Sequence, residues 1–168
     1  NVSFKAISLD EAGIVVEELK KYNVNIAYVT PSHQFPTGTI MSISRRTELL
    51  NWANENLNRY IVEDDYDSEF KYTGRPIPAL KATDINDKVI YLGSFSKSIS
   101  PAIRVSYLVL PKALLNIYQR KLPYFICPVP TLNQKILYRF IKDGHFVKHI
   151  NKMRTLYKKK REFLVNII

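Results

Sequence analysis

The sequence predicts an α/β fold in which a mostly parallel sheet is flanked by helices. Short apolar segments typical of strands alternate with longer segments of helical periodicity, and this alternation is typical of parallel sheets. The chain has 168 residues, the length of one domain, and 46% of them are hydrophobic, enough to build a buried core. No internal repeat or linker interrupts it, so residues 1–168 are expected to form one compact unit.

The expected strands are short apolar runs with clear ends. They lie at 25–30, 60–64, 88–94 and 105–110. Pro31 stops the first strand and Pro111 closes the last, because proline has no backbone N–H to donate to a sheet. The second strand ends in acidic residues, and the third runs directly into a Ser-Phe-Ser-Lys segment. Polar side chains therefore follow the apolar part of each inner strand.

Helices are expected between and after these strands. A serine followed by two acids predicts a helix over 8–22, and apolar spacing predicts another from Ser42. From Lys112 onward the chain predicts three helices, separated by the prolines in 123–130 and by Gly144. Three helices in succession indicate the start of a second subdomain or an edge that faces a dimer partner.

Composition excludes several classes of protein. The single cysteine, Cys127, excludes a disulfide framework and fits a reducing compartment, so a cytoplasmic location is expected. No run of about 18 apolar residues is present, so no transmembrane helix is expected. The start at Asn1 is neither a signal peptide nor an initiating methionine, which indicates a piece of a longer protein. No metal site is expected either, because the histidines have no metal-ligand company and fit structural or surface positions; they are His33, His145 and His149.

The net charge of +10 is concentrated near the end of the chain. Residues 142–161 hold eight basic residues against Asp143 alone, among apolar residues at near-helical spacing. This pattern favours an amphipathic helix with a solvated basic face; a surface that contacts phosphates is the alternative. No zinc finger, helix-turn-helix or RNA-binding motif accompanies the charge.

Three polar clusters follow strands, at 31–38, 63–67 and 94–97, and Arg104 comes seven residues after the last lysine. Ligands of open α/β sheets bind outside the carboxyl ends of the strands, so these clusters are expected to converge. A lysine, carboxylates, hydroxyls and an arginine together suit a phosphorylated carbonyl cofactor that forms a Schiff base with the lysine. Taken singly, each has an ordinary alternative as a surface lysine, a turn acid or a cap serine.

The order of these motifs resembles one family over nearly the whole chain. The matching stretches are Thr-Pro-Ser-His-Gln-Phe-Pro-Thr-Gly at 30–38, Val-Glu-Asp-Asp-Tyr-Asp-Ser-Glu-Phe at 62–70, Gly-Ser-Phe-Ser-Lys-Ser at 93–98, Pro-Ala-Ile-Arg at 101–104 and Asp-Gly-His-Phe at 143–146. They resemble the aminotransferase-like domain of fold type I pyridoxal-phosphate proteins, and within it the MocR-type transcriptional regulators of the GntR superfamily. The chain would then be a fragment of the large domain of that fold.

The resemblance implies a role for each motif residue. Lys97 would form the Schiff base with pyridoxal 5'-phosphate, and is the one catalytic residue that the pattern assigns. Asp64 would keep the pyridine nitrogen protonated, because a nearby carboxylate favours the charged form. Tyr66 would donate to the phenolic oxygen of the cofactor. The residues implied for the phosphate are Ser94, Ser96 and Arg104.

Two departures from the aminotransferase pattern favour a sensor over an enzyme. Phe35 stands where aminotransferases usually have an asparagine that bonds the phenolic oxygen, and phenylalanine cannot donate. Tyr66 follows Asp64 by two positions, whereas many of the enzymes space these residues by three. Both departures leave cofactor binding intact as an expectation while weakening the case for efficient transamination.

The expected function is therefore a cofactor-binding domain that senses an amine or amino-acid effector in a transcriptional regulator. The regulator is expected to be a homodimer that binds DNA only through a winged helix-turn-helix preceding this fragment. The start and the C-terminal part of the cofactor domain would also lie outside residues 1–168. A working amino-acid aminotransferase is the alternative, and a cofactor-free dimerisation domain using the apolar segment 118–125 is a third.

Overall fold

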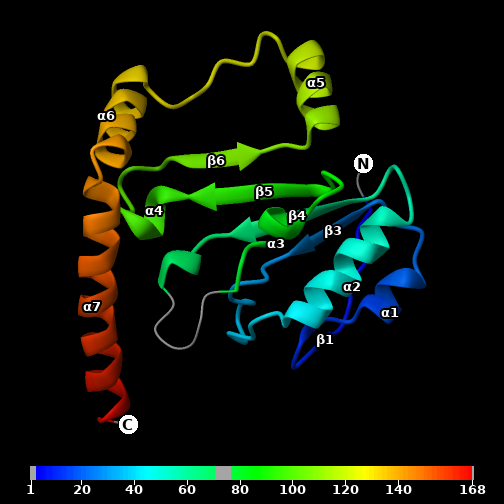
Figure 1. Ribbon diagram of the computed structural model, residues 1–168, viewed down its shortest axis with the longest axis horizontal. Helices are drawn as coiled ribbons and strands as arrows, with labels where there is room; N and C mark the ends of the chain where they lie inside the picture. Colours follow the sequence, from blue (N-terminus) through cyan, green and yellow to red (C-terminus); the bar gives the residue numbers. More distant parts are fainter. Residues whose placement is uncertain (1–2, 71–76, 168) are drawn as a thin grey trace.

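The centre of the molecule is a four-stranded sheet with the order β3-β4-β5-β6 (Figure 1). The computed structural model describes residues 3–70 and 77–167, so the chain start at Asn1 lies outside the described residues. The strands are β3 (Ile26–Val29), β4 (Tyr60–Asp65), β5 (Val89–Ser94) and β6 (Ser106–Val109). The first three are parallel, and β6 runs antiparallel to β5. The expected α/β fold with a mostly parallel sheet is confirmed.

One face of this sheet is covered by helices and holds the core. The covering helices are α1 (Val16–Lys20), α2 (Ile43–Asn54) and α3 (Leu80–Thr83). Leu49 and Trp52 of α2 are fully buried together with Ile61 of β4 and Val89 of β5. Burying one large apolar side chain contributes about 1.5–3 kcal/mol, so this layer supplies much of the stability.

The other face of the sheet is open. Ile26 and Tyr28 of β3 are 58% and 60% exposed, and Leu108 of β6 is also exposed. Strand residues alternate between faces, so Ala27 and Val29, which lie between and after the exposed pair, are buried on the covered side.

The helix expected over 8–22 is wrong in its first half. A small antiparallel hairpin replaces it, formed by β1 (Leu9–Asp10) and β2 (Gly13–Ile14), and only α1 is helical. The Asp10 carboxylate accepts a hydrogen bond from the Ala12 N–H (2.8 Å) and thereby forms a turn. Gly13 has φ +114°, which a helix does not allow, so the acids after Ser8 form a turn and not a helix cap.

The helix expected from Ser42 is confirmed as α2. The Ser42 side chain caps it by accepting from the Arg45 N–H at 3.3 Å. In its first turn, buried Arg46 donates to the carbonyl oxygens of Met41 (3.1 Å) and Pro31 (2.9 Å). Because these carbonyls stand at the two ends of the loop that follows β3, Arg46 fixes that loop against the sheet.

The last third of the chain is helical, as expected. It consists of α5 (Lys112–Lys121), α6 (Thr131–Lys142) and α7 (His145–Val165). Gly144, at φ +75°, makes the break between α6 and α7. Figure 1 shows α7 standing beside the carboxyl ends of the parallel strands, next to the short helix α4 (Phe95–Ser98).

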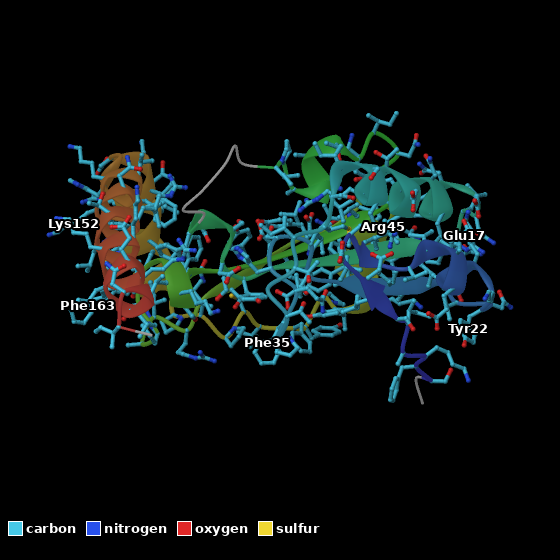
Figure 2. The ribbon with its side chains drawn as sticks, turned by 90° about the horizontal axis from the view of Figure 1, so that it is seen from below. Glu17, Tyr22, Phe35, Arg45, Lys152 and Phe163 are labelled. Carbon is cyan, nitrogen blue, oxygen red and sulfur yellow. The ribbon has the colours of Figure 1, made fainter. Side chains whose placement is uncertain are left out.

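Helix α7 packs along one side, through buried Ile150 and the ring of Phe146 against Phe95 (6.0 Å), and is exposed on the other. The Arg154 Nε donates to the Glu69 carbonyl oxygen (2.5 Å), and the rings of Phe70 and Tyr157 meet edge to face at 5.4 Å. Lys152 is exposed and projects away from the sheet (Figure 2). Over the described ranges, no helix is both long and apolar enough to cross a membrane.

Candidate functional site

A cavity of about 680 Å³ lies at the carboxyl-end edge of the sheet. Its walls come from the loop after β3, from the segment after β4, which continues into the 3₁₀ helix η1 (Ser68–Phe70), and from α4 and α7. Figure 1 shows α4 between the end of β5 and α7. The cavity therefore lies where the three motif segments follow the carboxyl ends of β3, β4 and β5, as the rule for open α/β sheets predicts.

Lys97 presents its amine to this cavity. Its side chain is 57% exposed, and its Nζ lies 4.2 Å from the centre of the Tyr66 ring. The nearest acidic partner is Asp67, whose Oδ2 lies 3.8 Å from the Lys97 Nζ. An accessible amine beside one carboxylate and over one aromatic ring is able to bond to a carbonyl ligand in the cavity.

Asp67 also binds an imidazole. Its Oδ1 lies 2.7 Å from the His33 Nδ1, and both side chains are mostly buried. The Tyr66 hydroxyl donates to the His33 carbonyl oxygen at 2.7 Å. Burial and the charges of Asp67 and Asp64 raise the pKa of Tyr66, so this hydroxyl remains protonated and able to donate near neutral pH.

Two residues of this cluster did not stand out in the sequence. His33 was expected to be structural or on the surface, and it lines the cavity beside Asp67. The two residues lie 34 positions apart in the chain, so no local spacing announces the pair. The sequence feature that could have indicated His33 is its position in the same loop after β3 as Phe35.

Asp64 and Ser94 lie on the open face of the sheet and do not line the cavity. The Tyr28 hydroxyl donates to the Asp64 carboxylate. Burial, followed by the hydrogen bond to Asp64, raises the pKa of Tyr28 to about 12. The Ser94 Oγ accepts from the Ser96 N–H (3.2 Å) and thereby caps α4, while Ser96 itself lines the cavity.

Arg104 is exposed and lies outside the cavity lining. Its backbone has φ +49°, a left-handed conformation that is unfavourable for a residue with a Cβ and is often found at functional sites. The cavity thus collects three of the six residues that the sequence pattern assigned to the site. They are Lys97, Tyr66 and Ser96.

The segment after β4 is held in place by Asp65, the last residue of that strand. Buried Asp65 accepts hydrogen bonds from the Tyr91 hydroxyl (2.6 Å) and the Ser68 hydroxyl (2.7 Å). Burial and the Asp65 carboxylate raise the pKa of Tyr91, so it stays a donor. Because Asp65 is fixed in this way, the next two residues, Tyr66 and Asp67, are directed toward the cavity.

Phe35 is exposed and forms part of the cavity wall. Figure 2 places it at the edge of the molecule. Its ring offers an apolar surface and no hydrogen-bond donor at the position where the aminotransferase pattern has an asparagine.

Comparison with known proteins places these features in a family context. The model of the family "Aminotransferase class I and II" matches residues 9–168. The uncharacterized HTH-type transcriptional regulator YdeL of Bacillus subtilis is 47% identical over 162 residues, covering 96% of this chain and 35% of the relative. The probable rhizopine catabolism regulatory protein MocR of Rhizobium meliloti is 34% identical over 159 residues, covering 95% and 32%.

A solved structure agrees with this fold. The kynurenine aminotransferase of Pyrococcus horikoshii superposes with a TM-score of 0.84 at 32% identity, covering 95% of this chain and 42% of that one. This chain therefore spans about a third of the length of the two regulators and less than half of the enzyme.

Proposed function

Because the chain belongs to the class I and II aminotransferase family, we propose that it is the cofactor-binding part of a transcriptional regulator that senses an amine or amino acid. Pyridoxal 5'-phosphate is the cofactor that this family membership implies. One observation carries the proposal: two HTH-type regulators match this chain at 47% and 48% identity, against 33% for an aromatic-amino-acid aminotransferase of Thermococcus litoralis.

The residues present fit this cofactor. Lys97 offers an accessible amine within a cavity of sufficient volume, which is the group that an aldehyde requires. Tyr66 and Ser96 line the same cavity, and they would donate to the phenolic oxygen and to the phosphate. Asp64, Ser94 and Arg104 lie outside the lining, and their proposed roles, a proton held at the ring nitrogen for Asp64 and phosphate binding for Ser94 and Arg104, rest on the family pattern. When bound, the cofactor supplies an aldehyde that takes up amines and a ring that withdraws electrons.

The cavity favours binding over turnover. Phe35 supplies apolar surface where an enzyme of this pattern supplies a donor, so one hydrogen bond to the phenolic oxygen is lost. An aminotransferase of amino acids is the second candidate, and the structural likeness to the Pyrococcus enzyme favours it. In that case Lys97 would also move a proton at the carbon beside the amine.

In the whole protein, we propose that this domain controls a DNA-binding domain. That domain would be an N-terminal winged helix-turn-helix, in keeping with the HTH-type relatives, and the regulator would be a cytoplasmic homodimer. Effector binding changes DNA affinity only if the effector binds the two arrangements of the dimer with different affinities.

The first test compares the full-length wild type with Lys97→Ala and with Lys135→Ala, a control on the exposed surface of α6. Pyridoxal 5'-phosphate is added, and visible absorption and a borohydride-stable adduct on Lys97 are measured. We expect both signals in the wild type and the control, and neither in Lys97→Ala. Absence of both signals from the wild type would refute the proposal.

A second test separates the sensor from the enzyme. The loaded protein is mixed with amino acids and a keto acid, and product is counted per protein molecule. A sensor is expected to form at most one product per protein molecule. It should also change its affinity for the operator when an amino acid is added. Many turnovers with unchanged DNA binding would establish the aminotransferase instead.

A further inference from the structure

We propose that Asp67, held by His33, is a positioning residue that directs Lys97 into the cavity and places a negative charge beside the nitrogen that would bond the cofactor. This inference rests on the proposed cofactor-binding function and assigns a role to two residues outside the motif set. Its basis is a continuous chain of contacts from the imidazole through the carboxylate to the amine.

The two oxygens of Asp67 have different partners. Oδ1 lies 2.7 Å from the His33 Nδ1, and Oδ2 lies 3.8 Å from the Lys97 Nζ. With only 28% and 21% of their side chains exposed, His33 and Asp67 are shielded, whereas Lys97 reaches into the open cavity. A carboxylate held at one oxygen cannot turn freely, so the second oxygen remains directed at the amine.

His33 is itself fixed by the residue that borders Lys97. The Tyr66 hydroxyl bonds the His33 carbonyl oxygen at 2.7 Å, and the Tyr66 ring lies below the Lys97 Nζ. The loop after β3 and the segment after β4 are therefore joined twice, once by Tyr66 and once by Asp67. The contact between His33 and Asp67 does not depend on the Tyr66 proton, so it continues to hold the Asp67 carboxylate when Tyr66 donates to the cofactor instead.

The electrostatic effect on Lys97 follows from the groups around the cavity. Asp67 is the one acid recorded within 4 Å of the Lys97 amine among residues 3–70 and 77–167. Asp64 lies beyond Tyr66 on the open face, and α7 contributes His149, Tyr157 and Arg161 to the opposite wall. A carboxylate at this distance favours the charged form of a nitrogen, and Asp67 is the group around the cavity placed to do so.

The test uses the full-length protein loaded with pyridoxal 5'-phosphate and measures the pH midpoint of its visible absorption change. Asp67→Asn is expected to lower this midpoint by about one pH unit, because an anion beside the nitrogen is lost. His33→Ala is expected to lower it by less, since the carboxylate remains but is no longer held. Asp67→Glu should restore most of the wild-type midpoint, and Asp143→Asn, a control at the end of α6, should leave it unchanged.

The outcomes separate this inference from the function on which it rests. No visible absorption in the wild type would refute cofactor binding itself. Normal absorption with an unchanged midpoint in both Asp67→Asn and His33→Ala would overturn the positioning role alone. If Asp67→Asn does not fold by circular dichroism, His33→Ala decides the question: a lowered midpoint supports the role, and an unchanged one overturns it.

Discussion

At the scale of the single residue, buried charge holds the site's scaffold together. Arg46 and Glu63 are 4% and 0% exposed and lie 3.9 Å apart, and Glu63 accepts the N–H groups of Leu80 (2.7 Å) and Lys81 (2.9 Å). Burial raises the pKa of Glu63, while these two N–H groups and Arg46 oppose the rise. The pair thereby joins the loop after β3 to α3 beneath the sheet.

Replacement of Arg46 by leucine should destabilise the protein strongly. It leaves Glu63 buried without a cation and removes donors from the carbonyls of Pro31 and Met41. Breaking a buried pair from one side costs about 3–5 kcal/mol of the free energy of unfolding. Urea denaturation measures this cost. The control Arg59→Leu, at a partly exposed pair with Glu55, should lose less, and equal losses in both variants would contradict the argument.

The raised pKa of Tyr28 makes the folded protein lose stability at alkaline pH. The folded protein holds this proton more tightly than the unfolded chain, whose tyrosine has the ordinary pKa of 10.0. The stabilising contribution is complete below about pH 10 and is lost as the pH rises toward about 12. Tyr28→Phe should therefore lose less stability than the wild type as the pH rises from about 10 to about 12, measured by thermal denaturation. An equally steep loss would argue against the hydrogen bond to Asp64.

At the scale of the element, close packing between β5 and β6 depends on one glycine. A Cβ at Gly93 would collide with the ring of Tyr107, which crosses over it from β6. The same ring lies 5.2 Å from Phe95 at the start of α4, so the contact reaches the helix that carries Lys97.

Gly93→Ala should therefore lower the free energy of unfolding by about 1–3 kcal/mol, the usual cost of overpacking. In the Tyr107→Ser background, the same Gly93→Ala change should cost less free energy of unfolding than it does in the wild type, because the obstructing ring is absent. Chemical denaturation of the four proteins measures this coupling. Independent, additive losses would show that the ring does not cause the effect.

The elements that could be predicted from sequence are those with a strong local signal. The strands were predicted because each is a short apolar run with a clear end, and α2 was predicted from its apolar spacing after Ser42. The first half of the helix expected over 8–22 failed because a turn at Asp10 and the backbone of Gly13 override the apolar spacing. That turn is reinforced by Arg45 of α2, whose Nη2 lies 2.7 Å from the Asp10 Oδ2, a contact with no local signature.

At the scale of the whole molecule, the motif order predicted the edge of the sheet at which the cavity and the candidate site lie. It did not predict which side chains meet there, because that depends on how segments distant in sequence are joined. Lys97, Tyr66 and Ser96 meet at the cavity, whereas Asp64 and Ser94 face the open side of the sheet. The His33–Asp67 pair was missed for the same reason, and α7 was recognised as a basic helix but not as a wall of the cavity.

Since α7 forms one wall of the cavity, loosening that wall should speed release of the cofactor. Tyr157→Ala removes a cavity-lining ring and its edge-to-face contact with Phe70, a contact worth about 0.5–1.5 kcal/mol beyond area burial. We expect cofactor release from the full-length protein to accelerate by up to about tenfold, since 1.4 kcal/mol corresponds to a factor of ten. Tyr138→Ala on α6, whose ring lies outside the cavity lining, should release the cofactor at the wild-type rate. Decay of the visible absorption after transfer to cofactor-free buffer measures these rates, and equal rates in both variants would show that α7 does not retain the cofactor.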